Sequence, residues 1–254
     1  LPGDPALTML GVDAPDSAIE ALRLELGLDR PAFVRYFDWI AGLFQGEMGL
    51  SYVYRVPVTE LIGQRLHVTL PLSIGAMVVA TLVSLTLGFF AATNHNRIGD
   101  YGVMGFSQLG LAIPDFWFGI LLIILFAVVL HLLPSGGFPG WDEGIWHGVR
   151  ALLLPIFTQA LSLTAIMTRV TRSSVLEVAL EDYVRTARAK GLSRRAALWR
   201  HVLRNALVPV LTIGGLLVAT VVTGTLVIEN VFALPGVGKL IFDAIPNRDL
   251  MVVK

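Results

Sequence analysis

The side chains that could carry chemistry are few in this chain, and they stand apart from one another. Cysteine is absent, which excludes disulfides, thiolate metal sites and a cysteine nucleophile. The histidines are His67, His95, His131, His147 and His201. No two of them stand four residues apart on one helix, the spacing that places two metal ligands on one helical face. We therefore predict no metal site.

A glycine-rich segment near the end of the chain is a second candidate. Gly236-Val237-Gly238-Lys239 superficially resembles a phosphate-binding loop. Such a loop requires Gly-x-x-x-x-Gly-Lys followed by Ser or Thr, whereas Leu240 follows this lysine. We interpret the segment as a loop turn and expect no nucleotide-binding site in it.

The elements that carry these residues are too apolar for an ordinary soluble domain. Hydrophobic residues make up 55% of the 254 residues, above the about 45–50% that soluble domains use. A helix needs about 20 mostly apolar residues to cross a bilayer, and backbone groups without partners in lipid require it to be helical. Four stretches meet this length, which disfavours a soluble protein with buried helices. They cover residues 68–92, 102–133, 149–170 and 207–228.

The distribution of charge indicates the orientation, because the 19 basic and 19 acidic residues cancel and give no reason to expect nucleic-acid binding. Arg and Lys are concentrated between the third and fourth stretches, and such an excess marks the cytoplasmic side. The loop of residues 172–206 is therefore predicted to be cytoplasmic. Alternation places the turn 93–101 on the same side and residues 1–66 and 229–254 outside.

The fold class that follows is an all-α, polytopic membrane helix bundle. We divide the chain into an external segment with its elbow, residues 1–66, and a transmembrane domain, residues 67–254. A chain that begins and ends outside would gain one helix at each end if its true termini are cytoplasmic. We therefore expect four visible spans and six in the complete protein.

The external segment carries two helical patterns, over residues 17–26 and 32–43. Gly27 suits the left-handed position after the last turn of the first helix. Residues 59–66 read as an amphipathic elbow that leads into the first span. The segment is therefore expected to be folded.

Asp115 is an acid inside the second apolar stretch. It follows Pro114, about 20 Å along the helix from the cytoplasmic start of that stretch. Intramembrane acids are costly and usually face a cavity or a partner. Two interpretations stay open: Asp115 lines a translocation pathway, or it lies near an interface or bonds to backbone groups that Pro114 frees.

The cytoplasmic loop has a helical pattern of its own. Apolar residues at offsets of three and four predict one helical face, made by Leu176, Leu180, Tyr183, Val184 and Ala187. Gly191 ends this helix, Leu192 can pack back on its last turn, and Ser193 can cap a second helix. The pattern predicts two short helices at an angle. Such a hairpin could bind anionic lipid headgroups or dock into a groove of a soluble partner.

The hairpin resembles the coupling loop of binding-protein-dependent ABC permeases, most closely in the dipeptide, oligopeptide and nickel branch. The resemblance lies in the segment Asp182-Tyr183-Val184-Arg185-Thr186-Ala187-Arg188-Ala189-Lys190-Gly191-Leu192-Ser193. The general motif has Glu-Ala-Ala and then Gly, where this chain reads Arg-Thr-Ala and Gly191. The resemblance implies contact with an ATPase through Asp182, Tyr183, Arg185, Thr186, Ala187, Lys190, Gly191, Leu192 and Ser193.

The resemblance covers nearly the whole chain. It extends over residues 1–5, 26–31 and 46–52 of the external segment, 205–209 after the hairpin, and 229–232 with 235–238 near the end. His67 is a departure, because the family often has proline there, and it puts only the local elbow geometry in question.

The resemblance implies the transmembrane domain of a type I ABC importer in a cell inner membrane. Its expected partners are a second homologous permease subunit, two ATP-binding subunits, an external solute-binding protein and the lipid bilayer. ATP and Mg would be bound by the ATPases, so we expect no cofactor and no catalytic residue in this chain. The substrate stays open among dipeptides, oligopeptides, glutathione-like peptides and nickel chelates.

Two rival functions belong to other classes. An ion-coupled secondary transporter could use Asp115 as its proton or cation site. An intramembrane hydrolase would need a Ser/His/Asp set or a metal-ligand pair at one depth in the spans, and the sequence offers neither. Neither rival requires a docking hairpin of this pattern, so the hairpin favours the permease.

Overall fold

The computed structural model describes residues 5–11, 14–25 and 27–253. The described residues are largely helical, and the isolated bridge Leu50–Pro57 is the β-type pairing among them. The chain divides into two compact units. Unit 1 comprises Leu1–Thr69 and Pro235–Lys254, and unit 2 comprises Leu70–Leu234. The division at residue 66 that the sequence suggests stays a prediction.

Unit 1 is built from short helices and the beginning of a long one. They are α1 (Pro5–Leu10), α2 (Asp16–Glu25), α3 (Ala32–Phe44), the first part of α4 (Val58–Thr93), α11 (Val237–Ala244) and α12 (Leu250–Val253). Helices α2 and α3 confirm the two predicted patterns, although Leu26 lies outside the described residues. Gly27 has a φ of +61° and Leu28 N–H donates to Arg23 O at 2.9 Å, which confirms the expected helix end.

A small core and one buried acid hold unit 1 together. Its apolar cluster combines α4, α11 and α12 through Val58, Leu61, Leu240, Ala244 and Val252. Asp249 is fully buried. It accepts hydrogen bonds from the Ser51 hydroxyl and, at 3.2 Å each, from the backbone N–H groups of Tyr52 and Val53. Burial also raises the pKa of the Tyr52 hydroxyl.

The glycine-rich segment in unit 1 begins a helix. Gly236 precedes α11, and Val237 and Lys239 lie in its first turn, so the interpretation as a loop turn is wrong. The Val237 N–H, unpaired within the helix at this end, donates to Thr69 Oγ1 at 2.9 Å.

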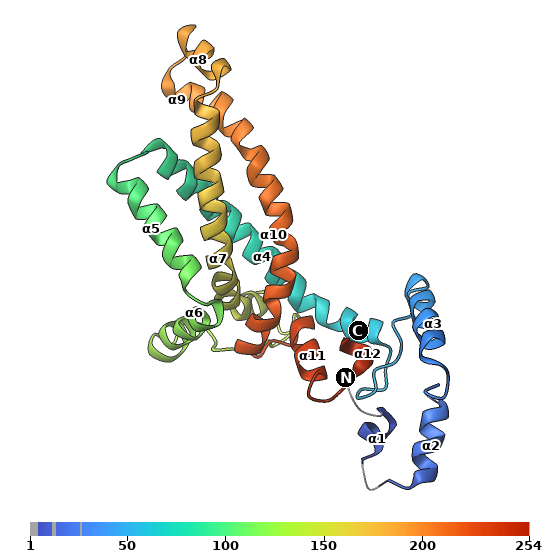
Figure 1. Ribbon diagram of the computed structural model, residues 1–254. Coiled ribbons are helices and arrows are strands. Elements are labelled where there is room, and N and C mark those ends of the chain that lie inside the picture. Colours follow the sequence, from blue (N-terminus) through green and yellow to red (C-terminus); the bar gives the residue numbers. More distant parts are fainter. Residues whose placement is uncertain (1–4, 12–13, 26, 254) are drawn as a thin grey trace. The chain divides into compact units, whose positions relative to one another are not determined.

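Unit 2 is the membrane bundle, arranged around α7 (Figure 1). Its helices after α4 are α5 (Ile98–Ala112), α6 (Asp115–Leu122), the π-helical η1 (Ile123–Val129), α7 (Ile145–Ala179), α8 (Asp182–Ala189), α9 (Arg194–Ala197), the π-helical η2 (Leu198–Val202) and α10 (Leu203–Val231). Helices α8 and α9 lie at one end of this unit and α6 at the other.

Small residues bring the long helices of unit 2 close together. A buried cluster joins α4, α7 and α10 through Ala76, Ala80, Ala160, Leu163, Met167, Val210, Leu217 and Val221. Alanines in this set let the backbones approach, as in other membrane bundles. The side-chain amide of Gln159 also crosses from α7 to α10, where it donates to Val221 O at 2.7 Å. Helix α7 therefore packs against both α4 and α10.

Among the residues that the structure describes, three helical segments are long and apolar enough to cross a membrane: Val58–Thr93, Ile145–Ala179 and Arg194–Val231. The predicted span over 102–133 is not one straight helix, because α5 and the segment Asp115–Val129 meet at 101°; together the two pass the same test as a bent pair, either a broken fourth span or a re-entrant loop. Pro114 excludes Ile113 from the helical region, and Ile113 has φ −85° and ψ 123°. Residues 59–66, read as an elbow, continue without interruption into the first span.

Candidate functional site

The hairpin begins where α7 ends, at Ala179. Leu180 follows as its C-cap and Glu181 is extended, with φ −63° and ψ 145°, before α8 starts. The predicted single helical face from 176 to 187 is therefore wrong, since it spans this break. Leu180 is 68% exposed, whereas Val184 is only 3% exposed.

Gly191 makes the turn of the hairpin. It has a φ of +95°, a conformation that strains residues with a Cβ. The Leu192 N–H donates to Ala187 O at 3.2 Å and the Gly191 N–H donates to Arg188 O at 3.0 Å. These two bonds form the paired closure of a Schellman motif. The predicted helix end at Gly191 is confirmed.

The second helix of the hairpin begins at Ser193, whose hydroxyl accepts from the Ala196 N–H at 3.3 Å. The predicted N-cap is thus confirmed. The helix itself is longer than expected, because α9, η2 and α10 form one helical segment, Arg194–Val231. Pro209 lies inside it. The tip of the hairpin is therefore continuous with a membrane span and has no flexible linker to it.

The inner side of the hairpin is anchored in an apolar cluster at the ends of α4, α7 and α10. Its buried members are Ala92, Val175, Val184, Ala197, Val202 and Ala206, with Leu192 and Leu198 packed against them. Trp199 contacts Phe89 of α4 with ring centroids 5.2 Å apart. Asn205 donates its amide to Tyr183 Oη at 2.9 Å and so joins α10 to α8.

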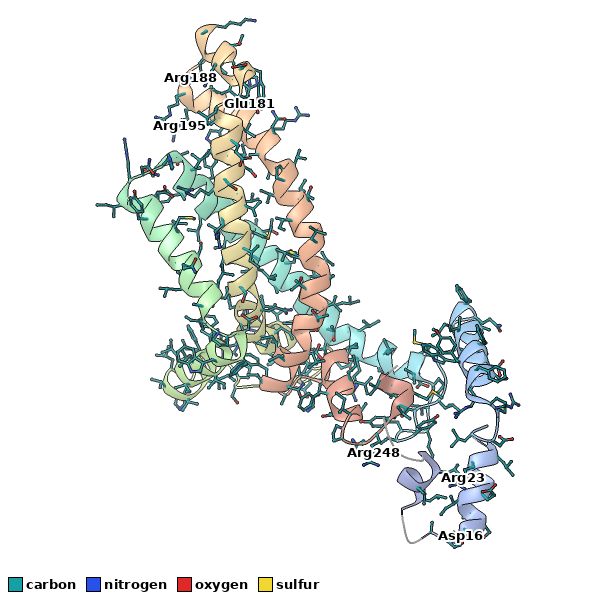
Figure 2. The ribbon with its side chains drawn as sticks, viewed as in Figure 1. Asp16, Arg23, Glu181, Arg188, Arg195 and Arg248 are labelled. Atoms are coloured by element: carbon teal, nitrogen blue, oxygen red, sulfur yellow. The ribbon has the colours of Figure 1, made fainter. Side chains whose placement is uncertain are left out.

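The outer side of the hairpin is polar and exposed. Figure 2 labels Glu181, Arg188 and Arg195 around α8 and α9, and all three are exposed. Among the predicted coupling residues, the exposed ones are Asp182, Tyr183, Arg185, Thr186, Lys190, Gly191 and Ser193. Ala187 and Leu192 are partly buried. The structure thus brings the nine residues into one hairpin, with an exposed polar face and an apolar face packed on the bundle.

Asp115 follows the C-terminal end of α5. It lies in the first turn of α6, directly after the break between the two helices. It accepts a hydrogen bond from the hydroxyl of Ser162 on α7. Its partner in the structure is therefore this side chain and not backbone freed by Pro114. Sequence reasoning missed Ser162, because a serine in an apolar stretch gives no distinctive signal. A pathway role for Asp115 stays a prediction.

Sequence reasoning also missed an ion pair between the buried Asp100 and the partly exposed Arg172. Arg172 lies in the basic loop 172–206 and Asp100 in the turn 93–101, and nothing in either segment of the sequence signals the pair. Within the described ranges, no group of three or more His, Cys, Asp or Glu side chains is placed to hold a metal ion.

The helices around α7, with the hairpin at one end, have the architecture of a multi-pass membrane helix bundle. Comparisons with known proteins agree. The family model "Binding-protein-dependent transport system inner membrane component" matches residues 84–253, and the corresponding N-terminal model matches residues 1–73. The chain belongs to this family and is a permease subunit of a binding-protein-dependent ABC importer.

Several relatives match the chain over its full length. A putative peptide transport system permease protein of Brucella suis is 41% identical over 100% of this chain and 81% of its own. The oligopeptide transport system permease protein of Bacillus subtilis is 39% identical over 99% and 81%. The glutathione transport system permease protein of Escherichia coli is 40% identical over 100% and 80%.

One solved structure supports the fold. The crystal structure of an amino acid ABC transporter with histidines matches with a TM-score of 0.55 over 77% of this chain and 83% of that chain. At 15% identity, this likeness shows the fold alone.

Proposed function

We propose that this chain is a permease subunit of an ATP-driven importer of small peptides, and that its hairpin transmits the movement of a separate ATPase. The hairpin geometry supports this proposal. Its outer face offers charged residues and small ones, such as Thr186 and Ala189, that fit a groove. Its inner face is packed on three helices of the bundle.

The mechanism follows from how the hairpin is attached. When ATP binding closes the ATPases, their groove displaces α8 and α9. Val184 and Leu192 pack against Ala92, Val175 and Val202, so this displacement is passed to α4, α7 and α10. Because α9 continues into α10 without a linker, that span moves as a lever. The bundle then changes between outward and inward openings, a shift between two packed states.

The proposed assembly contains a second permease subunit, two ATP-binding subunits that hold ATP and Mg, and an external solute-binding protein. This chain contributes part of the pathway and performs no covalent chemistry. The names of its relatives point to peptides, namely oligopeptides in one case and glutathione in another. We propose small peptides as the substrate class, with a nickel chelate as the competing substrate to be tested.

The test is reconstitution of the purified complex in liposomes with its binding protein and a labelled dipeptide. We expect uptake that requires both ATP and the binding protein. Uptake that runs on an ion gradient without ATP would overturn the proposal in favour of an ion-coupled transporter. Uptake of the nickel chelate but not of peptides would overturn the substrate class.

A labelling experiment tests the orientation of the hairpin. Lys190→Cys places an exposed thiol at the end of α8, and the chain has no other cysteine. We expect an impermeant thiol reagent to label it in inside-out vesicles and not in intact cells, because the basic loop is cytoplasmic. Ser17→Cys, exposed on α2, should show the opposite pattern. Labelling of Lys190→Cys in intact cells would contradict the topology.

A second prediction concerns Asp115. We expect Asp115→Asn to reduce peptide uptake about tenfold while the complex still assembles, since an intramembrane acid generally serves a pathway or a partner. Ser162→Ala removes the hydrogen-bond donor and should have a smaller effect. The measurement is uptake at equal amounts of complex. Normal uptake by the Asn variant would make Asp115 a structural residue.

A further inference from the structure

The end of unit 2 that carries the hairpin holds an ion pair outside the hairpin itself. Asp100 lies in the first turn of α5 and is 1% exposed. Arg172 of α7 donates to both of its carboxylate oxygens, with Nε 2.6 Å from Oδ1 and Nη2 2.7 Å from Oδ2. The two residues are 72 positions apart, so the pair joins two different helices.

The same carboxylate also fixes the turn between α4 and α5. The Asn96 N–H donates to Asp100 Oδ2 at 3.0 Å, and Asn96 is held at a φ of +60°. Arg172 Nη2 lies 3.0 Å from His95 Nδ1, which accepts when it carries no proton. His95 Nδ1 is also 3.3 Å from the carboxylate. One buried acid therefore connects the turn, α5 and α7.

The pair lies beside a tight contact between α4 and α7. Gly88 of α4 faces Thr171, the residue directly before Arg172. Arg172 itself is seven residues before the end of α7 at Ala179, where the hairpin begins. Farther along α5, Gly110 faces Ala165 of α7. Helix α5 thus lies along α7, and its fixed end is next to the hairpin.

The geometry of the pair restrains direction as well as distance. A planar guanidinium that donates to both oxygens of a carboxylate resists rotation and sliding, which a single ammonium contact does not. Removing one partner would leave a buried charge without compensation. A buried ion pair is weak evidence for stability, because apolar residues often serve as well. The Asp100–Arg172 pair is therefore better explained by the directional restraint it places on the two helices than by a gain in stability.

We propose that Asp100 and Arg172 form an ionic tie that makes α5 move with α7 when the hairpin is displaced. The movement then reaches the bend between α5 and α6, where Asp115 contacts Ser162. The inference rests on the proposed ATP-driven import. In it Asp100 and Arg172 are positioning residues, which act on transport through the helices they join.

The first experiment measures peptide imported per ATP hydrolysed in the reconstituted complex. Asp100→Asn keeps the size of the side chain but loses the charge that aligns the guanidinium. We expect this ratio to fall about twofold to thirtyfold, the range over which substitutions in coupled networks act, while hydrolysis continues. Arg172→Lys keeps the positive charge without the forked donor and should also lower the ratio.

The matched control is Asp38→Asn, which changes an exposed acid 3.5 Å from Arg30 in the same way. It should leave the ratio unchanged. If the wild-type complex shows no ATP-dependent uptake, the proposed function fails and this inference fails with it. If the wild type is coupled and Asp100→Asn equals Asp38→Asn, the tie alone is wrong.

A second experiment, for the case that the charge variants assemble poorly, replaces the ion pair with a covalent cross-link. Asp100→Cys and Arg172→Cys are combined, in a complex whose other subunits lack cysteine, and are joined by a short bifunctional thiol reagent. We expect the cross-linked complex to regain the wild-type ratio that the unlinked one has lost. A cross-linked complex that hydrolyses ATP but imports no peptide would show that the two helices must separate, which overturns the proposal.

Discussion

Gly191→Val is expected to uncouple ATP hydrolysis from transport while the protein still inserts into the membrane. The left-handed backbone at Gly191 costs a β-branched residue about 1–2 kcal/mol. A Cβ at this position would meet no atom within 4 Å, so the strain comes from the backbone alone. The chain can relieve it by extending α8, which breaks the bonds from Leu192 and Gly191 back to α8 and re-aims the outer face.

The measurement is ATPase co-purification and substrate-stimulated hydrolysis, and we expect a loss of about tenfold or more in at least one of them. Gly46→Val is the matched control. Gly46 has a φ of +81°, meets no atom within 4 Å and ends α3 with the same pair of bonds, including Glu47 N to Gly42 O at 2.8 Å. If both variants behave like the wild type at normal membrane levels, the hairpin is not the coupling element and the lipid-binding interpretation gains support.

Features with a local cause could be predicted from the sequence. The turn at Gly191 and the cap at Ser193 depend on neighbours within five residues, and both are confirmed. Three of the four apolar stretches lie in single helices that can cross a bilayer, because length and hydropathy alone decide this for an unbroken helix.

Breaks in the helices were harder to predict. Pro71, Pro155 and Pro209 lie inside helices, whereas the chain bends sharply at Pro114. All four prolines lie within apolar stretches of the sequence, so the sequence pattern does not distinguish a proline tolerated inside a helix from one at a bend. The break after Leu180 was not predicted for another reason. Apolar residues continue at intervals of three and four across it, so the pattern resembles one uninterrupted helix.

Contacts between distant residues left no pattern in the sequence. Asp100 pairs with Arg172, and Asp249 accepts from Ser51, 198 positions away. The residues that flank each acid in the sequence do not distinguish it from an exposed surface acid. Only the folded structure shows that Asp100 and Asp249 are buried. The apolar pattern does not specify how α5 lies along α7, and the Asp100 pair fixes this position. It also does not specify how the segment between α11 and α12 contacts the loop around Ser51, and Asp249 fixes that contact.

Gly88→Ala is expected to destabilise the bundle, although Gly→Ala inside a helix usually stabilises. A Cβ at Gly88 would lie 2.5 Å from Thr171 Cβ and 2.9 Å from the backbone oxygen of Thr168. Neither atom can turn away, since one is bonded to the backbone and the other belongs to it. Helices α4 and α7 must then separate, and we expect a cost of about 2–3 kcal/mol, as for other overpacked cores.

Gly105→Ala on α5 is the control for this change. Its Cβ would meet no atom within 4 Å, so only the helix preference of alanine acts, and stability should rise by about 0.5–1 kcal/mol. Thermal unfolding of the purified subunit should therefore shift in opposite directions for the two variants. The separation at Gly88 also opens the end of unit 2 where Ala92 and Val175 support the hairpin. A Gly88→Ala protein as stable as the wild type would show that α4 and α7 do not meet at this glycine.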